Sequence, residues 1–96
     1  MEVHSLEEVR ENIDRLDRAI IGLMAERGTF VEQAARFKTS RAEVEAPNRV
    51  EQVVAKVRTL ATEAGLAPQV AEAAYRAMIA EFIEFEHLAL RVREGA

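Results

Sequence analysis

The first third of the chain carries one uninterrupted amphipathic pattern, and the length of that pattern constrains the fold more than any other feature. Apolar side chains recur in alternating steps of three and four at Leu6, Val9, Ile13, Leu16, Ile20, Leu23, Phe30, Ala34 and Phe37. Ser5 followed by Glu8 is a capping-box pattern at its start, and the next punctuation comes only at Thr39 and Ser40. The pattern predicts a helix of roughly 33 residues, about 50 Å long at ~1.5 Å per residue.

A helix of that length does not fit inside a monomeric globule of this chain. A chain of 96 residues has a radius of gyration near ~12.5 Å when compact and is only about 30 Å across. The helix must therefore protrude, and its apolar seam needs a partner. We expect the chain to form a homodimer along this helix.

Two further helices follow, and each is marked by local signals. The segment from Thr39 to Ala46 mixes charged and small residues and predicts a loop, after which Pro47 suits the first turn of a helix. Gly65 is placed to end that helix, and Pro68 to begin the next. The two apolar faces are Val50, Val53, Val54, Val57, Leu60 and Ala61, then Val70, Ala74, Met78, Ile79, Phe82, Ile83 and Ala89. No strand pattern, internal repeat or linker occurs, so we predict one all-α domain over residues 1–96, with one long and two medium helices.

Composition excludes several classes of function. The formal net charge of −4 and an aromatic content of 5% supply neither a basic stripe nor a stacking platform, so nucleic acid is not an expected partner. No apolar run is long enough to cross a bilayer. Zero cysteines exclude thiolate chemistry, and His4 and His87 are too far apart in sequence to indicate a metal pair, so we expect no metal and no cofactor. The first residues lack a secretion signal, which predicts a cytoplasmic protein.

Arg27 occupies a seam position where the pattern calls for an apolar side chain. On a continuous helix Lys38 lies within ~20° of the same azimuth and about 16 Å further along the axis. Two long cationic side chains would then converge on one ligand with several anionic or acceptor groups. The alternative for Arg27 is an interhelical salt bridge, or an arginine whose charged end reaches solvent.

Glu86 is the second charge at an apolar position, because it follows Ile79 and Phe82 by seven and four residues on the third helix. Burial of a carboxyl group favours its protonated form, which is a hydrogen-bond donor. Glu86 could equally be the counterion of Arg27 or Lys38.

Two further arginines complete a cationic set. Arg10 lies about 25 Å from Arg27 along a straight helix and about 100° away in azimuth, so these two could share a small ligand only across an antiparallel dimer. Arg49 comes near the start of the second helix, and a helix N-terminus favours anions. Arg10, Arg27, Lys38 and Arg49 together describe a site for a small polyanion.

Several segments, in this order and spacing, resemble the all-helical chorismate mutase family. They are LEEVRENIDRLD from Leu6 to Asp17, then Glu26-Arg27, Phe37-Lys38, Pro47-Asn48-Arg49-Val50 and Gly65-Leu66. The resemblance covers nearly the whole chain. It implies an intertwined homodimer of three-helix chains with two equivalent sites for a dicarboxylate enolpyruvyl ether, and a pericyclic reaction that needs no cofactor.

The resemblance also implies a role for each cationic residue. Arg27, together with Arg10 of the partner subunit, would hold the two substrate carboxylates, and Lys38 would donate to the ether oxygen. Arg49 would order the neighbouring loop and close the pocket. Glu86 falls where many members carry Gln, and it would have to be protonated to donate to the same oxygen.

Three features bear on which branch of the family the chain resembles. Mutases commonly carry carboxylates that bind the ring hydroxyl where this chain has Ala46 and Val50, and the string Ala46-Pro47-Asn48-Arg49-Val50 is similar to isochorismate pyruvate lyases. Glu86 is more similar to mutases of 4-amino-4-deoxychorismate. We expect a Claisen rearrangement of chorismate or its 4-amino analogue, with isochorismate pyruvate lyase as the alternative. A non-catalytic dimeric helical binding module is the second alternative.

Overall fold

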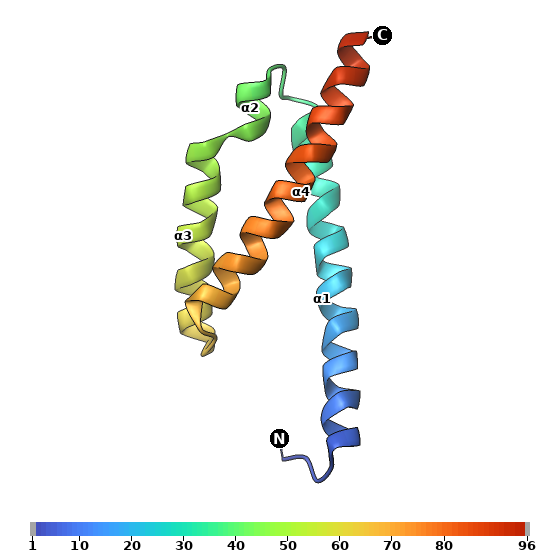
Figure 1. Cartoon of the computed structure of the whole chain (residues 1–96), viewed down its shortest axis with the longest axis vertical. Coiled ribbons are helices and arrows are strands. Elements are labelled where there is room, and N and C mark those ends of the chain that lie inside the picture. The colour runs from blue at the N-terminus through green and yellow to red at the C-terminus, as the bar shows by residue number, and fades with distance from the viewer. Residues whose placement is uncertain (1, 96) are drawn as a thin grey trace. The chain divides into compact units, whose positions relative to one another are not determined.

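The computed structural model describes residues 2–95, and no strand occurs in that range. The helices are α1 (Leu6–Ala35), α2 (Arg41–Glu45), α3 (Pro47–Ala64) and α4 (Pro68–Gly95) (Figure 1). The chain divides into two compact units, one ending at Gln33 and the other beginning at Ala34. The all-α prediction with three main helices is confirmed, and a one-turn helix is added between the first two. Only α3 is of medium length, because α4, with 28 residues, is nearly as long as α1, with 30.

Helix α1 begins at the predicted capping box. The Glu8 amide donates to Ser5 Oγ at 3.1 Å, and the return bond to the Glu8 carboxylate comes from the His4 amide at 2.7 Å. These bonds satisfy amide groups that have no partner inside the helix.

The predicted end of this helix is wrong by about three residues, because the predicted helix included Lys38. Helix α1 ends at Ala35, and the amides of Phe37 and Lys38 bond three residues back, to Ala34 O at 3.0 Å and Ala35 O at 3.1 Å. These tighter bonds close the last turn and release the chain from the helix. Lys38 therefore does not stand on α1, and the prediction that it shares an azimuth with Arg27 on one continuous helix is wrong.

The apolar seam of α1 is exposed in the single chain. Six of its large side chains have exposed fractions between 48% and 65%: Leu6, Ile13, Leu16, Ile20, Leu23 and Phe30. An apolar stripe of this length is the kind of surface that another protein surface covers.

Helices α3 and α4 form an antiparallel hairpin (Figure 1). Gly65 ends α3 with a φ of 80°, and the bonds Gly65 N to Thr62 O and Leu66 N to Ala61 O form a Schellman motif. The left-handed φ favours glycine at this turn, as the sequence predicted.

The hairpin is held by a small apolar core between α3 and α4. Val53, Val57, Ala61 and Ala71 are buried, with Tyr75 and Ile79 packed against them. The predicted face of α3 is mostly confirmed, although Leu60 is exposed. On α4 the buried positions are Ala71, Glu86, His87 and Leu90, so the predicted stripe is displaced: Val70, Ala74 and Ala89 are exposed.

Ion pairs join the two helices outside this core. Arg76 contacts Glu51 on α3 at 2.8 Å and Glu72 on its own helix at 2.7 Å, and Arg58 also contacts Glu72 at 2.7 Å. Hydrogen bonds from the Arg76 guanidinium lower the pKa of Glu51 and Glu72, and the same bonds raise the pKa of Arg76.

The segment predicted as a loop before Pro47 contains the one-turn helix α2. Ser40 caps it by accepting a hydrogen bond from the Glu43 amide at 3.2 Å, and Val44, only 2% exposed, anchors it. Helix α2 packs against α4. Ala46 joins α2 to α3 in a left-handed conformation with φ 37° and ψ 58°. Burial of Val44 supplies the tertiary contact that makes so short a helix stable, and a single sequence gave no sign of that contact.

Candidate active site

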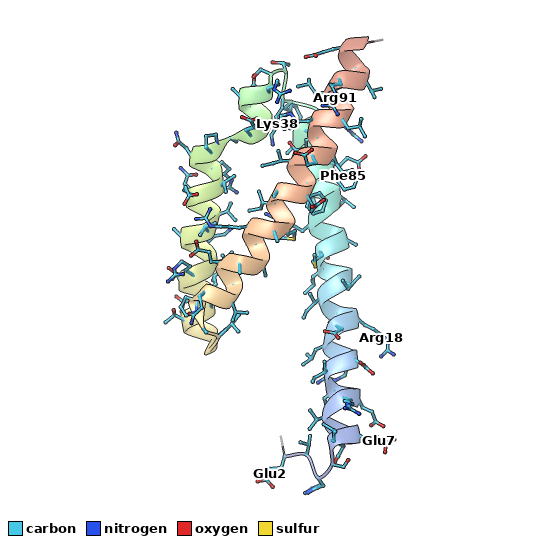
Figure 2. All side chains as sticks on the ribbon, viewed as in Figure 1. Glu2, Glu7, Arg18, Lys38, Phe85 and Arg91 are labelled. Atoms are coloured by element: carbon cyan, nitrogen blue, oxygen red, sulfur yellow. The ribbon has the colours of Figure 1, made fainter. Side chains whose placement is uncertain are left out.

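Two of the predicted site residues meet directly on the inner face of α4. Lys38 Nζ lies 2.8 Å from Glu86 Oε2, and Figure 2 shows Lys38 beside the C-terminal half of α4. Glu86 is 7% exposed, as its apolar position predicted. The structure thus pairs Glu86 with Lys38.

The pair is asymmetric in its access to solvent. The Lys38 side chain is 25% exposed, whereas that of Glu86 is 8% exposed. A desolvated carboxyl group needs a partner, and a charge-assisted bond of this length satisfies it. Of the two groups, the Lys38 ammonium, which is the hydrogen-bond donor, is therefore the more accessible to solvent.

Further contacts tie the segment that carries Lys38 to α4. Arg93 Nη2 donates to the Lys38 carbonyl at 3.1 Å, and His87 Nε2 lies 3.5 Å from Glu45 Oε1 of α2. His87 is as buried as Glu86. All of these residues belong to the unit that begins at Ala34.

His87 was considered only as a metal ligand, and Arg93 was not predicted to take part in these contacts. His87 follows Ile83 by four residues and precedes Leu90 by three, so helical spacing was a signal that it faces inward. No local signal marked Arg93, because its partner is a backbone carbonyl 55 positions away.

The predicted carboxylate-binding arginines lie elsewhere on the chain. Arg10 is exposed and Arg27 is half-buried on α1, about 25 Å apart along the axis. Arg49 is exposed at the third position of α3, beside the half-buried Val50. Arg49 shares a unit with Lys38 and Glu86, whereas Arg10 and Arg27 belong to the unit that ends at Gln33.

Residues 2–95 were also compared with the requirements of a metal site and of a membrane-spanning helix. That range contains no group of three His, Asp or Glu side chains arranged to hold a metal ion. None of its helices combines the length and the apolar character that crossing a membrane requires.

The described residues thus form an all-helical fold in which a buried carboxyl group contacts a lysine and the predicted arginines lie at separate positions. Comparison with known proteins makes this specific: residues 9–87 match the family described as chorismate mutase type II. Isochorismate pyruvate lyase of Pseudomonas aeruginosa is 33% identical over 91 residues, which are 95% of this chain and 90% of that protein. The chain belongs to the chorismate mutase type II family and is an enzyme of the chorismate mutase-like type, so the resemblance stated from the sequence is confirmed.

Proposed function

We propose that the protein catalyses a pericyclic conversion of a dicarboxylate enolpyruvyl ether. The first candidate is the Claisen rearrangement of chorismate to prephenate, or of 4-amino-4-deoxychorismate to its amino counterpart. The observation that carries the proposal is the Lys38–Glu86 contact, because it places two groups able to bind one ether oxygen side by side in a member of this family.

The rearrangement makes limited chemical demands. The ether C–O bond breaks as a C–C bond forms between the enolpyruvyl methylene and the ring, and no atom enters or leaves. Catalysis then consists of folding the substrate into a compact conformer and stabilising the negative charge that grows on the ether oxygen. The Lys38 ammonium donates a hydrogen bond to that oxygen.

Glu86 donates to the same oxygen only when it is protonated. In the structure its Oε2 accepts from Lys38. A donor role for Glu86 therefore requires a protonated side chain that no longer accepts from Lys38.

The substrate carboxylates require cations from a second chain. Arg27 holds one carboxylate and Arg10 of the partner subunit holds the other, while Arg49 orders the segment that closes the site. The exposed seam of α1 supports a homodimer of this kind, because pairing two copies covers it. Each whole chain then serves as a single domain of the dimer.

Isochorismate pyruvate lyase is the second candidate. The named activity of the Pseudomonas relative favours it, and so does the absence of a carboxylate at Ala46 and Val50, where mutases bind the ring hydroxyl. In this reaction the C–O bond breaks while a ring hydrogen moves to the enolpyruvyl methylene, which gives salicylate and pyruvate. The same donors to the ether oxygen serve both reactions.

Product identification distinguishes the candidates. The purified protein is incubated separately with chorismate, isochorismate and 4-amino-4-deoxychorismate, and the products are separated by chromatography. Prephenate or its amino counterpart establishes the mutase, and salicylate with pyruvate establishes the lyase. No turnover of any of the three overturns the proposal and leaves a helical binding module.

Two arginine variants test the shared site. Arg27→Ala abolishes turnover, whereas Arg18→Ala, an exposed arginine on the same helix (Figure 2), leaves it unchanged. Mixing Arg10→Ala and Arg27→Ala chains under conditions of subunit exchange restores about one quarter of the parent activity, because half of the dimers are mixed and each holds one intact site. No recovery on mixing contradicts the assignment of Arg10 to the partner's site.

A further inference from the structure

We propose that Arg93 is a positioning residue for Lys38, an inference that rests on the proposed function. Lys38 is held at two points by one helix. Its ammonium donates to Glu86 at 2.8 Å, and its carbonyl oxygen accepts from Arg93 Nη2 at 3.1 Å.

The two holding residues share one face of α4. Glu86 and Arg93 are seven residues apart, which is two helical turns, so they lie within ~20° in azimuth and about 10.5 Å apart along the axis. Leu90 stands between them and is buried. The Lys38 segment therefore lies along this face, with its backbone beside the last turns and its side chain directed towards Glu86.

Lys38 needs this support because it stands outside any helix. Its amide closes the turn after α1 by bonding to Ala35 O at 3.1 Å, and α2 begins only at Arg41. A residue in such a segment lacks the i→i−4 backbone hydrogen bonds that fix the backbone of a helix. Contacts with α4 fix the backbone of Lys38 instead.

The two contacts differ in what happens during the reaction. The ammonium must change its hydrogen-bonding geometry when it donates to the substrate, so the contact with Glu86 is rearranged at each turnover. The bond from Arg93 to the carbonyl does not involve the ammonium. Arg93 can therefore hold the Lys38 backbone in place while its side chain exchanges partners, and a bond from a charged donor is strong enough for this role.

A purely structural alternative exists, because Arg93 is exposed and is the basic residue in the last turn of α4. A cation there stabilises the C-terminal end of a helix regardless of what it touches. Three variants separate the two roles. Arg93→Met removes the charge and the donors, Arg93→Lys keeps the charge and an N–H donor group, and Arg91→Met removes another exposed charge two residues earlier (Figure 2).

The expected result is a loss of kcat at nearly constant KM. Arg93→Met lowers kcat about 3- to 20-fold, below the roughly 100-fold that a 1 Å displacement of a catalytic group can cost. KM changes less than about twofold, because Lys38 contributes mainly in the transition state. Arg93→Lys recovers most of the loss and Arg91→Met shows none. Equal kcat values for Arg93→Met and Arg91→Met overturn the inference while leaving the proposed function intact.

Amide hydrogen exchange tests the inference without any turnover. Loss of the Arg93 bond speeds exchange in residues 36–46 of Arg93→Met relative to Arg91→Met, with the α3–α4 core unchanged. If the unmodified protein converts none of the three substrates, the proposed function fails and this measurement still decides whether Arg93 fixes the segment. Unchanged exchange in residues 36–46 overturns the positioning role.

Discussion

Replacing Lys38 with Met tests how much the Lys38–Glu86 pair contributes to the unfolding free energy. Methionine keeps much of the length of the side chain and removes the charge, so Glu86, 7% exposed, loses its cation. Breaking a fully buried pair costs about 3–5 kcal/mol, whereas an exposed pair contributes about 0–1 kcal/mol. Because the Lys38 side chain is 25% exposed, we expect the variant to lose about 1–3 kcal/mol of unfolding free energy near pH 8.

The assay is urea unfolding near pH 8 followed by circular dichroism at 222 nm, at one protein concentration, since the stability of the proposed dimer would depend on concentration. The double variant Lys38→Met/Glu86→Met is the matched control. Two apolar side chains replace the pair without leaving a buried charge, so it returns to within about 1 kcal/mol of the parent. No loss in the single variant, or no recovery in the double variant, refutes the reasoning.

Two further predictions follow from other contacts. Ala46→Gly raises the unfolding free energy by about 0.5 kcal/mol in urea titrations, because the left-handed conformation that costs alanine about 1 kcal/mol costs glycine little. Arg76→Met lowers the thermal midpoint by about 2–4 °C at low salt. That difference shrinks in 1 M NaCl, and also as pH falls below about 4, because the lowered pKa values of Glu51 and Glu72 contribute stability only while these groups are ionised.

The three long helices could be predicted because their signals are local. Ser5, Pro47, Gly65 and Pro68 each act on the backbone within one turn, and the structure places each at a helix end. Periodicity also identified most of the buried face of α3. On α4 the periodicity predicted the buried face only in part, because charged and aromatic residues occur on more than one side of the helix. The buried face of α4 depends on its contacts with α2 and α3.

The candidate site could be predicted as a list of residues but not as an arrangement. Glu86 was identified as a misplaced charge, yet helical spacing does not specify a partner 48 positions away. Lys38 was identified as a cation, but it was placed on a helix that ends three residues earlier. A single tight turn changes the direction of every side chain that follows it. Predictions of which residues share a helix face therefore hold only within one continuous helix.

The arginines on α1 owe their positions to a continuous helix, and under the proposed function substitutions there act through the substrate carboxylates. Lys38 owes its position to α4, through Glu86 at its ammonium and Arg93 at its carbonyl. Substitution of Arg93 should therefore change kcat with little effect on KM, whereas substitutions at Arg10 and Arg27 should weaken substrate binding as well.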